Sequence, residues 1–262
     1  MRTLLDAMVI SEVLSDDTAA FGIRGDIGFG IPGARRYRSG RNQSNGSLPD
    51  ATLPAVARPG IHAAGGDRPG QGMTPTRCTW ADGSDAAMQQ YHDTEWGVPQ
   101  HDDTALFEFI TLEGAQAGLS WRTILARRDA YREAFHGYDI AKVARMRDAA
   151  LEKLVSNSGI IRNRQKIWSV RANAQAAQRM AEQYGSLDRY LWSFVEGQPI
   201  INRWTERGQV PATTPVSDRM SKQLRKDGFG FVGSTICYAF MQATGMVNDH
   251  LVDCFRHPCP RA

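Results

Sequence analysis

The sequence has little of what marks secreted or membrane proteins. It has four cysteines in 262 residues, too few for a disulfide scaffold at this length. No stretch approaches the roughly eighteen uninterrupted apolar residues that a membrane-spanning helix needs. The apolar clusters at the N-terminus are broken by acidic residues such as Asp6 and Glu12, which argues against a signal peptide. We therefore expect a cytoplasmic protein with reduced thiols and no membrane attachment.

The sequence also has little net charge. Its 31 basic and 28 acidic side chains give +3. Any binding to nucleic acid must therefore depend on a local basic patch and not on the field of the whole protein. Hydrophobic residues make up 42% of the chain, enough to bury a sizeable core. This composition excludes disorder throughout the chain.

The composition changes near residue 76. Residues 1–76 hold 12 of the 25 glycines and 6 of the 12 prolines, but no tryptophan, cysteine or lysine. Such a segment cannot bury enough apolar surface to offset the entropy lost on ordering. We expect a disordered N-terminal extension over residues 1–76 and a folded domain over residues 77–262.

The folded part has a helical pattern. Apolar residues recur with the period of a helix, and glycine and proline separate the periodic segments. There is little of the alternation that is typical of strands. We therefore expect an all-α domain, in which the last two helices begin at serine caps, with helices over residues 104–117, 142–155, 163–184, 217–227 and 234–244.

One of these helices carries a carboxylate on its apolar face. On a helical wheel, Glu113 lies in the middle of the stripe that contains Leu106 and Ile110. A buried charge is costly unless it is paired or faces a ligand. Glu113 is therefore either held by a structural ion pair or directed at a bound molecule. Nearby glycines and Trp121 favour a flat, electron-poor or cationic ligand.

Two cysteines and two histidines at opposite ends of the domain are potential metal ligands. Cys78 and His92 lie near its start, and His250 and Cys254 have the spacing that places both on one face if their segment is helical. Two thiolates and two imidazoles make a closed tetrahedral site, so the metal would be structural zinc. Because no C-x-x-C pair is present, packed side chains without a metal remain the alternative. Cys237, in an apolar run, is expected in the core.

Residues 151–167 predict a helical hairpin with a basic end. One helix ends before Gly159. The next helix begins with three basic residues: Arg162, Arg164 and Lys166. This arrangement resembles a helix-hairpin-helix, in which turn amides and a helix N-terminus bind a DNA phosphate. An ordinary turn with solvated basic side chains gives the same pattern, because only one glycine stands where many such hairpins carry G-x-G.

Seven strings of residues match one known family in order and with nearly the expected spacing. They are Arg77–Trp80, Tyr91–Pro99, Leu112–Trp121, Gly159–Arg162, Trp192–Val195, Phe231–Tyr238 and Val247–His250. Together they resemble the type I 3-methyladenine DNA glycosylases, the bacterial Tag family. The similarity runs from Arg77 to about Cys254.

The resemblance implies a helix-hairpin-helix glycosylase fold with one structural zinc held by Cys78, His92, His250 and Cys254. It implies a monofunctional enzyme that flips 3-methyladenine out of alkylated double-stranded DNA and hydrolyses its N-glycosidic bond. No lysine is placed to form a Schiff base, so lyase activity is not expected. The partner is double-stranded DNA containing alkylated purines, and the protein is expected to act as a monomer.

The resemblance also assigns the site residues. Glu113 is the catalytic residue, accepting hydrogen bonds from the adenine, and the base is held between Tyr91 and Trp121 with two more tryptophans nearby, Trp80 and Trp96. The hairpin residues expected to bind DNA are Gly159, Arg162, Arg164 and Lys166.

The sequence departs from the family pattern near this pocket. Met88 stands where relatives often have an aromatic residue, and the stretch between Cys78 and His92 is one residue longer than usual. A glycosylase with a wider range of alkylated purines is therefore an alternative. A zinc-stapled DNA-binding module without catalysis is another, although it would have no use for Glu113 in an aromatic pocket.

A shortened chain that begins near Gly72 tests the division of the sequence. Because residues 1–76 lack the aromatic and cysteine content of the rest, we expect this chain to fold and to excise 3-methyladenine at the full-length rate. The measurement is release of free base from alkylated DNA by both proteins. Loss of solubility or of activity would show that the segment belongs to the working domain.

Overall fold

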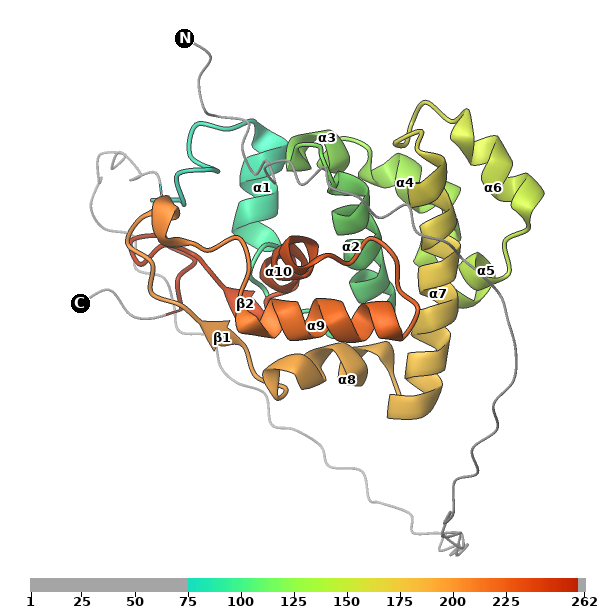
Figure 1. Ribbon diagram of the computed structural model, residues 1–262. Helices are drawn as coiled ribbons and strands as arrows, with labels where there is room; N and C mark the ends of the chain where they lie inside the picture. The colour runs from blue at the N-terminus through green and yellow to red at the C-terminus, as the bar shows by residue number, and fades with distance from the viewer. Residues whose placement is uncertain (1–74, 259–262) are drawn as a thin grey trace, which may run out of the picture. The chain divides into compact units, whose positions relative to one another are not determined.

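The computed structural model describes residues 75–258, so the extension expected over residues 1–76 lies almost entirely outside the described residues. Within the described part the chain is mostly helical, as expected (Figure 1). The helices are α1 (Ala86–Thr94), α2 (Asp103–Gln116), α3 (Trp121–Leu125), α4 (Arg128–Ala134), α5 (Ile140–Ala144), α6 (Asp148–Val155), α7 (Arg164–Tyr184), α8 (Leu187–Trp192), α9 (Pro215–Lys226) and α10 (Ser234–Ala243). Three short 3₁₀ turns are η1 (His136–Tyr138), η2 (Ser193–Val195) and η3 (Arg207–Gln209). The described part also has a parallel pair of two-residue strands, β1 (Ile200–Ile201) and β2 (Val247–Asn248).

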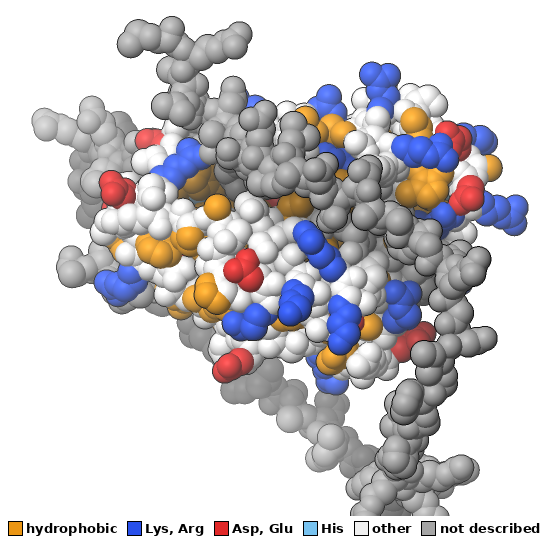
Figure 2. Space-filling model, in the orientation of Figure 1, with side chains coloured by type: hydrophobic (Ala, Val, Ile, Leu, Met, Phe, Trp, Pro, Cys, Tyr) orange, Lys and Arg blue, Asp and Glu red, His pale blue; other side chains and the backbone are white. Residues whose placement is uncertain are grey.

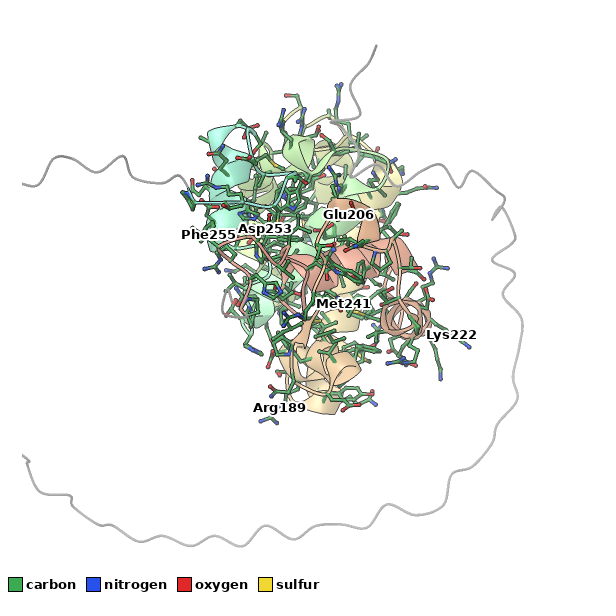
Figure 3. The ribbon with its side chains drawn as sticks, turned by 90° about the vertical axis from the view of Figure 1, so that its left-hand side faces the viewer. Arg189, Glu206, Lys222, Met241, Asp253 and Phe255 are labelled. Atoms are coloured by element: carbon green, nitrogen blue, oxygen red, sulfur yellow. The ribbon has the colours of Figure 1, made fainter. Side chains whose placement is uncertain are left out.

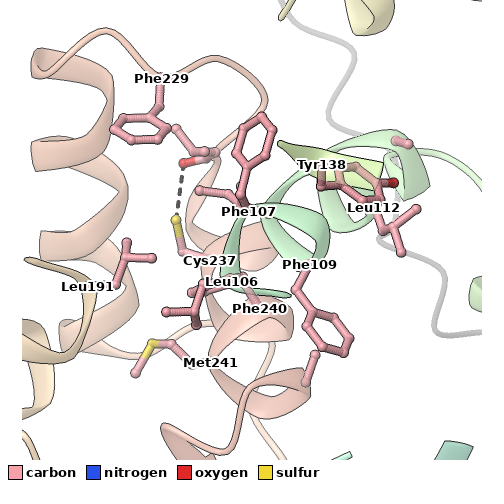
Figure 4. Close-up of a cluster of buried hydrophobic side chains, with 14 of the residues drawn as sticks. Leu106, Phe107, Phe109, Leu112, Tyr138, Leu191, Phe229, Cys237, Phe240 and Met241 are labelled. Carbon is pink, nitrogen blue, oxygen red and sulfur yellow. Dashed lines mark hydrogen bonds between the residues drawn. The ribbon is translucent and has the colours of Figure 1, made fainter. Parts of the chain in front are cut away.

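Helix α2 forms the centre of the core. It is buried from Leu106 to Gln116 on every side, because α3, α7, α8 and α10 pack around it. Figure 4 shows its Phe107 and Phe109 among side chains of α8 and α10. The single apolar stripe expected for this helix is therefore wrong, since a helix surrounded by protein is apolar all round. Glu113 is buried by the position of the whole helix.

The other half of the core comes from α10. Phe240 and Met241 are almost fully buried, and Figure 3 shows Met241 in the interior. Cys237 is buried as expected, and its Sγ donates to the carbonyl of Val232 at 3.3 Å (Figure 4). Burial raises the pKa of this thiol to about 12, so Cys237 behaves as a small apolar core residue.

The long helix α7 begins and ends as the sequence indicates. Asn163 caps its start by accepting from the backbone N–H of Lys166 at 3.0 Å. Its last residue is followed by Gly185 in the left-handed conformation, with φ of 94°. The helix expected over residues 142–155 is instead two helices, α5 and α6. The side chains of Arg171 and Gln175 on α7 take up the backbone carbonyls at the break, at 2.8 and 3.0 Å.

Both expected serine caps are wrong. Helix α9 is capped by Thr214 and has Pro215 in its first turn. Ser217 is the other half of a capping box, in which each side chain accepts from the backbone N–H of the other residue, at 2.8 and 3.2 Å. Helix α10 is capped by Gly233 and begins at Ser234 itself.

The loop after α1 packs against the end of α10. The backbone N–H of Gly97 donates to the carbonyl of Gln242 at 2.9 Å, and that of Gln100 donates to Thr244 at 3.0 Å. Gly245 has φ of +69°, and a Cβ there would lie 2.3 Å from the carbonyl carbon of Val98, so only glycine fits. These contacts hold the start and the end of the domain together. In the part of the chain that the structure describes, no helix has the length and apolar character needed to cross a bilayer.

Candidate functional site

Four ligand side chains from the two ends of the domain meet in the interior. They are Cys78, His92, His250 and Cys254; all are buried, and their ligand atoms all lie within 4.8 Å of one another. Three sulfur-to-nitrogen distances, from Cys78 to His250 and from Cys254 to both histidines, are 3.5 Å. Tetrahedral zinc with its usual bond lengths separates sulfur and nitrogen ligands by about 3.6 Å. The cluster can therefore hold a metal of this kind.

The outer nitrogen of each histidine ring has an acceptor. His92 Nδ1 lies 2.8 Å from Asp93 Oδ1, and His250 Nε2 lies 3.0 Å from the carbonyl oxygen of Trp96. These acceptors favour the tautomer with its proton on the outer nitrogen, so the inner nitrogen keeps its lone pair. Both rings are therefore oriented as ligands.

Of the two cysteines, Cys254 favours the thiolate form that binds a metal, and Cys78 keeps the shared proton. Their close approach lets them share a proton, which raises the pKa of Cys78 and lowers the pKa of Cys254, mainly through the hydrogen bond between them. The backbone N–H groups of Leu251 and Arg256 donate to the two sulfurs at 3.4 Å each. Such hydrogen bonds stabilise thiolates.

The ligands converge without the expected helix. Residues 249–258 form turns after β2, with Cys254 N–H donating to the carbonyl of Leu251 at 2.8 Å. The segment is held by Asp249, whose carboxylate is 2% exposed and accepts from four side chains at 2.6–2.8 Å: Asn202, Trp204, Tyr238 and Gln242. The i, i+4 spacing therefore picked two residues that do come together, but not through the helix that it assumed. No local pattern could have predicted the Asp249 network, because its members come from distant segments.

Four aromatic rings form a continuous group beside the metal cluster. Trp80 and Trp96 pack edge to face, with ring centroids 5.1 Å apart, and both contact the histidine rings of the cluster. Tyr91 and Trp121 lie 5.1 Å apart at 43°, and Tyr91 is 6.5 Å from Trp80. Rings 5.1 Å apart are already in contact, so a base cannot lie between Tyr91 and Trp121 in this form. The two rings lie side by side at an angle.

Glu113 is buried beside this aromatic group without a partner. It is 4% exposed, and within residues 75–258 no group donates a hydrogen bond to its carboxylate. Burial raises its pKa to about 8. Glu113 in turn raises the pKa of Tyr91, after the larger effect of burial, which indicates that the two side chains are close. The indole Nε1 of Trp121 is also buried and without a partner in the described part of the chain.

Glu108, on the same helix as Glu113, is a buried carboxylate that has ion-pair partners. Its carboxylate accepts from Arg128 at 2.7 Å and from Arg132 at 2.8 Å, and Arg128 also donates to Glu95 at 2.6 Å. The structural ion pair considered for Glu113 therefore belongs to Glu108. Because Glu113 is unpaired, the other interpretation applies to it: a carboxylate directed at a ligand.

The expected hairpin lies between α6 and α7 and packs on α4. A Cβ at Gly159 would lie 2.9 Å from Cβ of Ala130, so this close approach requires glycine. Arg162 is exposed and forms no ion pair among residues 75–258. Arg164 instead pairs with Glu152.

The other two basic residues of this hairpin, Arg164 and Lys166, contact groups of the protein itself. Arg164 lies over the ring of Trp168, with its guanidinium carbon 4.1 Å from the ring centroid. Lys166 donates to the backbone carbonyls of Ala115 and Ala117, at 2.9 and 2.6 Å. Of the three predicted basic residues, Arg162 alone presents a free cation, as far as residues 75–258 show.

A second hairpin between α9 and α10 was not singled out from the sequence. It contains Gly228-Phe229-Gly230, the G-x-G pattern that the first hairpin lacks. Its Gly230 exchanges two hydrogen bonds with the side chain of Asn173 on α7, at 2.7 and 3.2 Å. A Cβ at Gly114 would lie 3.1 Å from Cβ of Phe231, so this turn packs directly against α2, one residue from Glu113.

The surface of α9 is basic. Figure 2 shows several lysine and arginine side chains over this helix and few acidic ones, and Figure 3 shows Lys222 pointing outward. The exposed basic residues of α9 are Arg219, Lys222, Arg225 and Lys226. A local positive patch of this kind suits a polyanion, although the net charge of the chain is small.

Comparison with known proteins places these features in a family. Residues 80–257 match the family model described as methyladenine glycosylase. DNA-3-methyladenine glycosylase 1 of Escherichia coli (strain K12) is 48% identical over 182 residues, which cover 70% of this chain and 97% of the relative.

Two solved structures are similar to the domain. A crystal structure of 3-methyladenine DNA glycosylase I aligns with a TM-score of 0.67 and 49% identity, covering 70% of this chain and all of that one. A Staphylococcus aureus 3-methyladenine DNA glycosylase I, studied for its recognition of 3-methyladenine, aligns with a TM-score of 0.66 and 34% identity over 68% of this chain and 95% of its own. From the family match, the high identity and the shared fold, we conclude that this chain belongs to the methyladenine glycosylase family.

Proposed function

We propose that this protein is a monofunctional DNA glycosylase that excises 3-methyladenine from alkylated double-stranded DNA. One observation supports this function most directly. Glu113 is buried and unpaired near Tyr91, whose ring contacts Trp121, in a chain of the methyladenine glycosylase family. A carboxylate next to aromatic faces suits a flat cation, and an N3-methylated adenine in DNA is one.

The charge of the substrate decides the chemistry. The positive charge on the methylated base weakens its glycosidic bond, and the electron pair of the breaking C–N bond neutralises the base as it leaves. A water molecule then adds its oxygen to C1′ of the sugar and loses a proton to solvent. The protein must extrude the nucleotide and hold the base, and it gains little by protonating a group that is already cationic.

The pocket residues divide this work. Tyr91 and Trp121 supply two adjoining aromatic walls, which attract the cationic ring by stacking and by cation–π interaction. Glu113 accepts hydrogen bonds from the amino edge of the adenine and must be ionised to do so best. Because its pKa is raised to about 8 in the free protein, a cationic base binds together with loss of a proton from Glu113.

Lys166 gives no free nucleophile for a lyase step. Burial lowers its pKa, but its amine donates to two backbone carbonyls. Because these acceptors engage the amine, it is not presented to a substrate as a nucleophile would be. This supports a hydrolytic, monofunctional reaction.

A wider range of alkylated purines remains the alternative activity. Met88 is 8% exposed on α1, one helical turn before Tyr91. A flexible thioether there adapts to more shapes than an aromatic ring does. Measuring which free bases are released from alkylated DNA distinguishes the two activities. A protein that binds DNA and releases no base would instead support a binding module without catalysis.

We further propose that Cys78, His92, His250 and Cys254 hold one structural zinc ion. Four protein ligands leave no open coordination position, so the ion would fasten α1 to the C-terminal segment and take no part in the reaction. The protein would act as a monomer on the DNA.

We propose that both hairpins contact the DNA backbone. Gly159 and Arg162 offer a turn and a free cation on one side of α4. The α9–α10 hairpin offers its G-x-G turn, the N-terminus of α10 and the exposed side chains of Arg225 and Lys226. The small cavity lined by Lys166 of one hairpin, Phe231 of the other and Gly114 of α2 shows that they flank the same part of α2.

Elemental analysis should find one zinc per chain. Cys254→Ser should lose the metal and lower the free energy of unfolding by several kcal/mol, because metal binding contributes directly to folding. Cys259→Ser is the control, at a position outside the described residues, and should keep the metal. A folded protein without metal, or loss of zinc only in the control, would contradict the assignment.

Arg162→Ala should weaken binding to all duplexes and reduce the dependence of log K on log salt by about one, as loss of one phosphate contact does. The preferred base should not change. Arg189→Ala is the matched control, because Arg189 is exposed on α8 beyond the far end of α7, about 30 Å away at 1.5 Å per residue. A change in the excised base would place Arg162 in the pocket instead.

Glu113→Gln should reduce excision by about 10- to 100-fold, the scale of one charge-assisted hydrogen bond, and leave binding to undamaged DNA unchanged. For the wild type, kcat/KM should rise with pH up to about 8, where Glu113 of the free enzyme is ionised. The variant should lack this rise. Full activity of the variant would return Glu113 to a structural role.

Glu113→Gln should lower the excision rate but raise the free energy of unfolding. The folded state raises the pKa of Glu113 from 4.5 to about 8, so its contribution to stability is fully present below pH 4.5 and is lost as the pH rises to about 8. Relative to the wild type, Glu113→Gln should therefore gain unfolding free energy across this window. Denaturant unfolding at several pH values measures it, and a constant difference would show that the carboxylate is not desolvated.

A further inference from the structure

The side chain of Lys166 contacts the backbone of the protein itself. It is on the first turn of α7, in the hairpin assigned to DNA, yet its Nζ donates to the carbonyls of Ala115 and Ala117. These carbonyls lie at the end of α2, where a helix has acceptors without internal partners. The side chain is half-buried, and it lines the small cavity that also contains Thr111 and Phe231. Its ammonium is thus directed at the protein and away from a DNA phosphate.

Lys166 contacts the central peptide of a turn. The backbone N–H of Leu119 donates to the carbonyl of Gln116 at 2.6 Å. Ala117 has φ of −42° and ψ of 115°, and Gly118 has φ of +76°. These angles define a type II turn. Types I and II differ by rotation of the central peptide, whose oxygen is the Ala117 carbonyl, so the bond from Lys166 favours type II directly.

The turn separates the two pocket residues that recognise the base. Glu113 is four residues before Ala117 on α2, and Trp121 is the first residue of α3. Ser120 caps α3 by accepting from the backbone N–H of Thr123 at 3.2 Å. A change of turn type would therefore move the start of α3, and the Trp121 ring with it, relative to the carboxylate.

We propose that Lys166 is a positioning residue for base excision, which holds the 116–119 turn so that Glu113 and Trp121 face the same bound base. The proposal rests on the glycosylase function proposed above. It assigns Lys166 a role different from the phosphate contact that its place in the hairpin suggests. It also makes the 116–119 turn depend on the hairpin that carries Arg162.

Lys166→Met tests the proposal, with Lys153→Met as the matched control on the exposed face of α6. The rate of base release at saturating enzyme should fall about tenfold or more for Lys166→Met, the scale of one or two charge-assisted hydrogen bonds. The salt dependence of binding to an undamaged duplex should equal that of the control. Arg162→Ala, measured alongside, gives the change in slope that a lost phosphate contact produces.

A second variant reaches the same turn without touching Lys166. Gly118→Ala opposes the positive φ of the turn, and nothing lies within 4 Å of the added Cβ, so packing is not disturbed. It should lower the rate at saturation in the same way, and the double variant should lose less than the product of the two single losses. Gly118→Ala also keeps the test open if Lys166→Met does not fold.

Three outcomes would overturn the proposal. An unchanged rate at saturation with a salt slope lower by about one would make Lys166 a phosphate contact. A lowered melting temperature with an unchanged rate would make it structural only. Fully multiplicative losses in the double variant would show that Lys166 and the turn act independently. A wild-type protein that releases no base would instead contradict the proposed function, and is thereby distinguished from all three.

Discussion

The meeting of four ligand side chains between α1 and the C-terminal segment is the contact on which the site depends. His92, one of the four, directly follows Tyr91 in α1, so the orientation of one pocket wall is fixed by the cluster. Trp80 contacts the His92 ring on one side and Tyr91 on the other, and Trp96 contacts the His250 ring and Trp80. The four ligand side chains and the aromatic group are therefore one packed unit.

Helix α2 carries two buried carboxylates, which differ in their partners. Glu108 shows how this chain stabilises a buried carboxylate, with two arginines as partners. Glu113 has no such partner in the described residues, and its pKa is raised in consequence. Burial of an unpaired carboxylate costs stability, and under the proposed function a cationic base would offset this cost. Sites in which local stability is given up in this way are typical of function.

The sequence predicted which side chains are buried together better than it predicted their surroundings. The convergence of the two cysteines and two histidines could be predicted because these residues are rare and chemically specific, and the burial of Glu113 because a carboxylate in an apolar helix is unusual. The cap at Ser217 was wrong because Thr214 accepts from the backbone N–H of Ser217 and Pro215 has no N–H that needs an acceptor. The cap at Ser234 was wrong because α10 already begins at Ser234, after Gly233, without a side-chain cap. The break between α5 and α6 could not be predicted, since the side chains that take up its free carbonyls come from α7.

Long-range contacts also decide what the hairpin lysine does. A lysine at the start of a helix is equally consistent with a phosphate and with a carbonyl, and only the position of α2 distinguishes them. Asp249 is a similar case, because its four donors become neighbours only in the folded chain. The α9–α10 hairpin, in contrast, carries a G-x-G signal that the sequence alone could have supplied.

The contact between the two ends of the domain joins residues that are translated at different times. Cys78 and its partner His250 are separated by 172 positions along the chain. At about 5–20 residues per second, roughly 10 to 30 seconds pass between translation of one and of the other. During that interval Tyr91 of α1, with Trp80 and Trp96 on either side of the helix, has no 249–258 segment to pack against. The nascent chain therefore keeps these aromatic side chains exposed until residues 249–258 have been translated, and only then can the group be packed as the structure shows it.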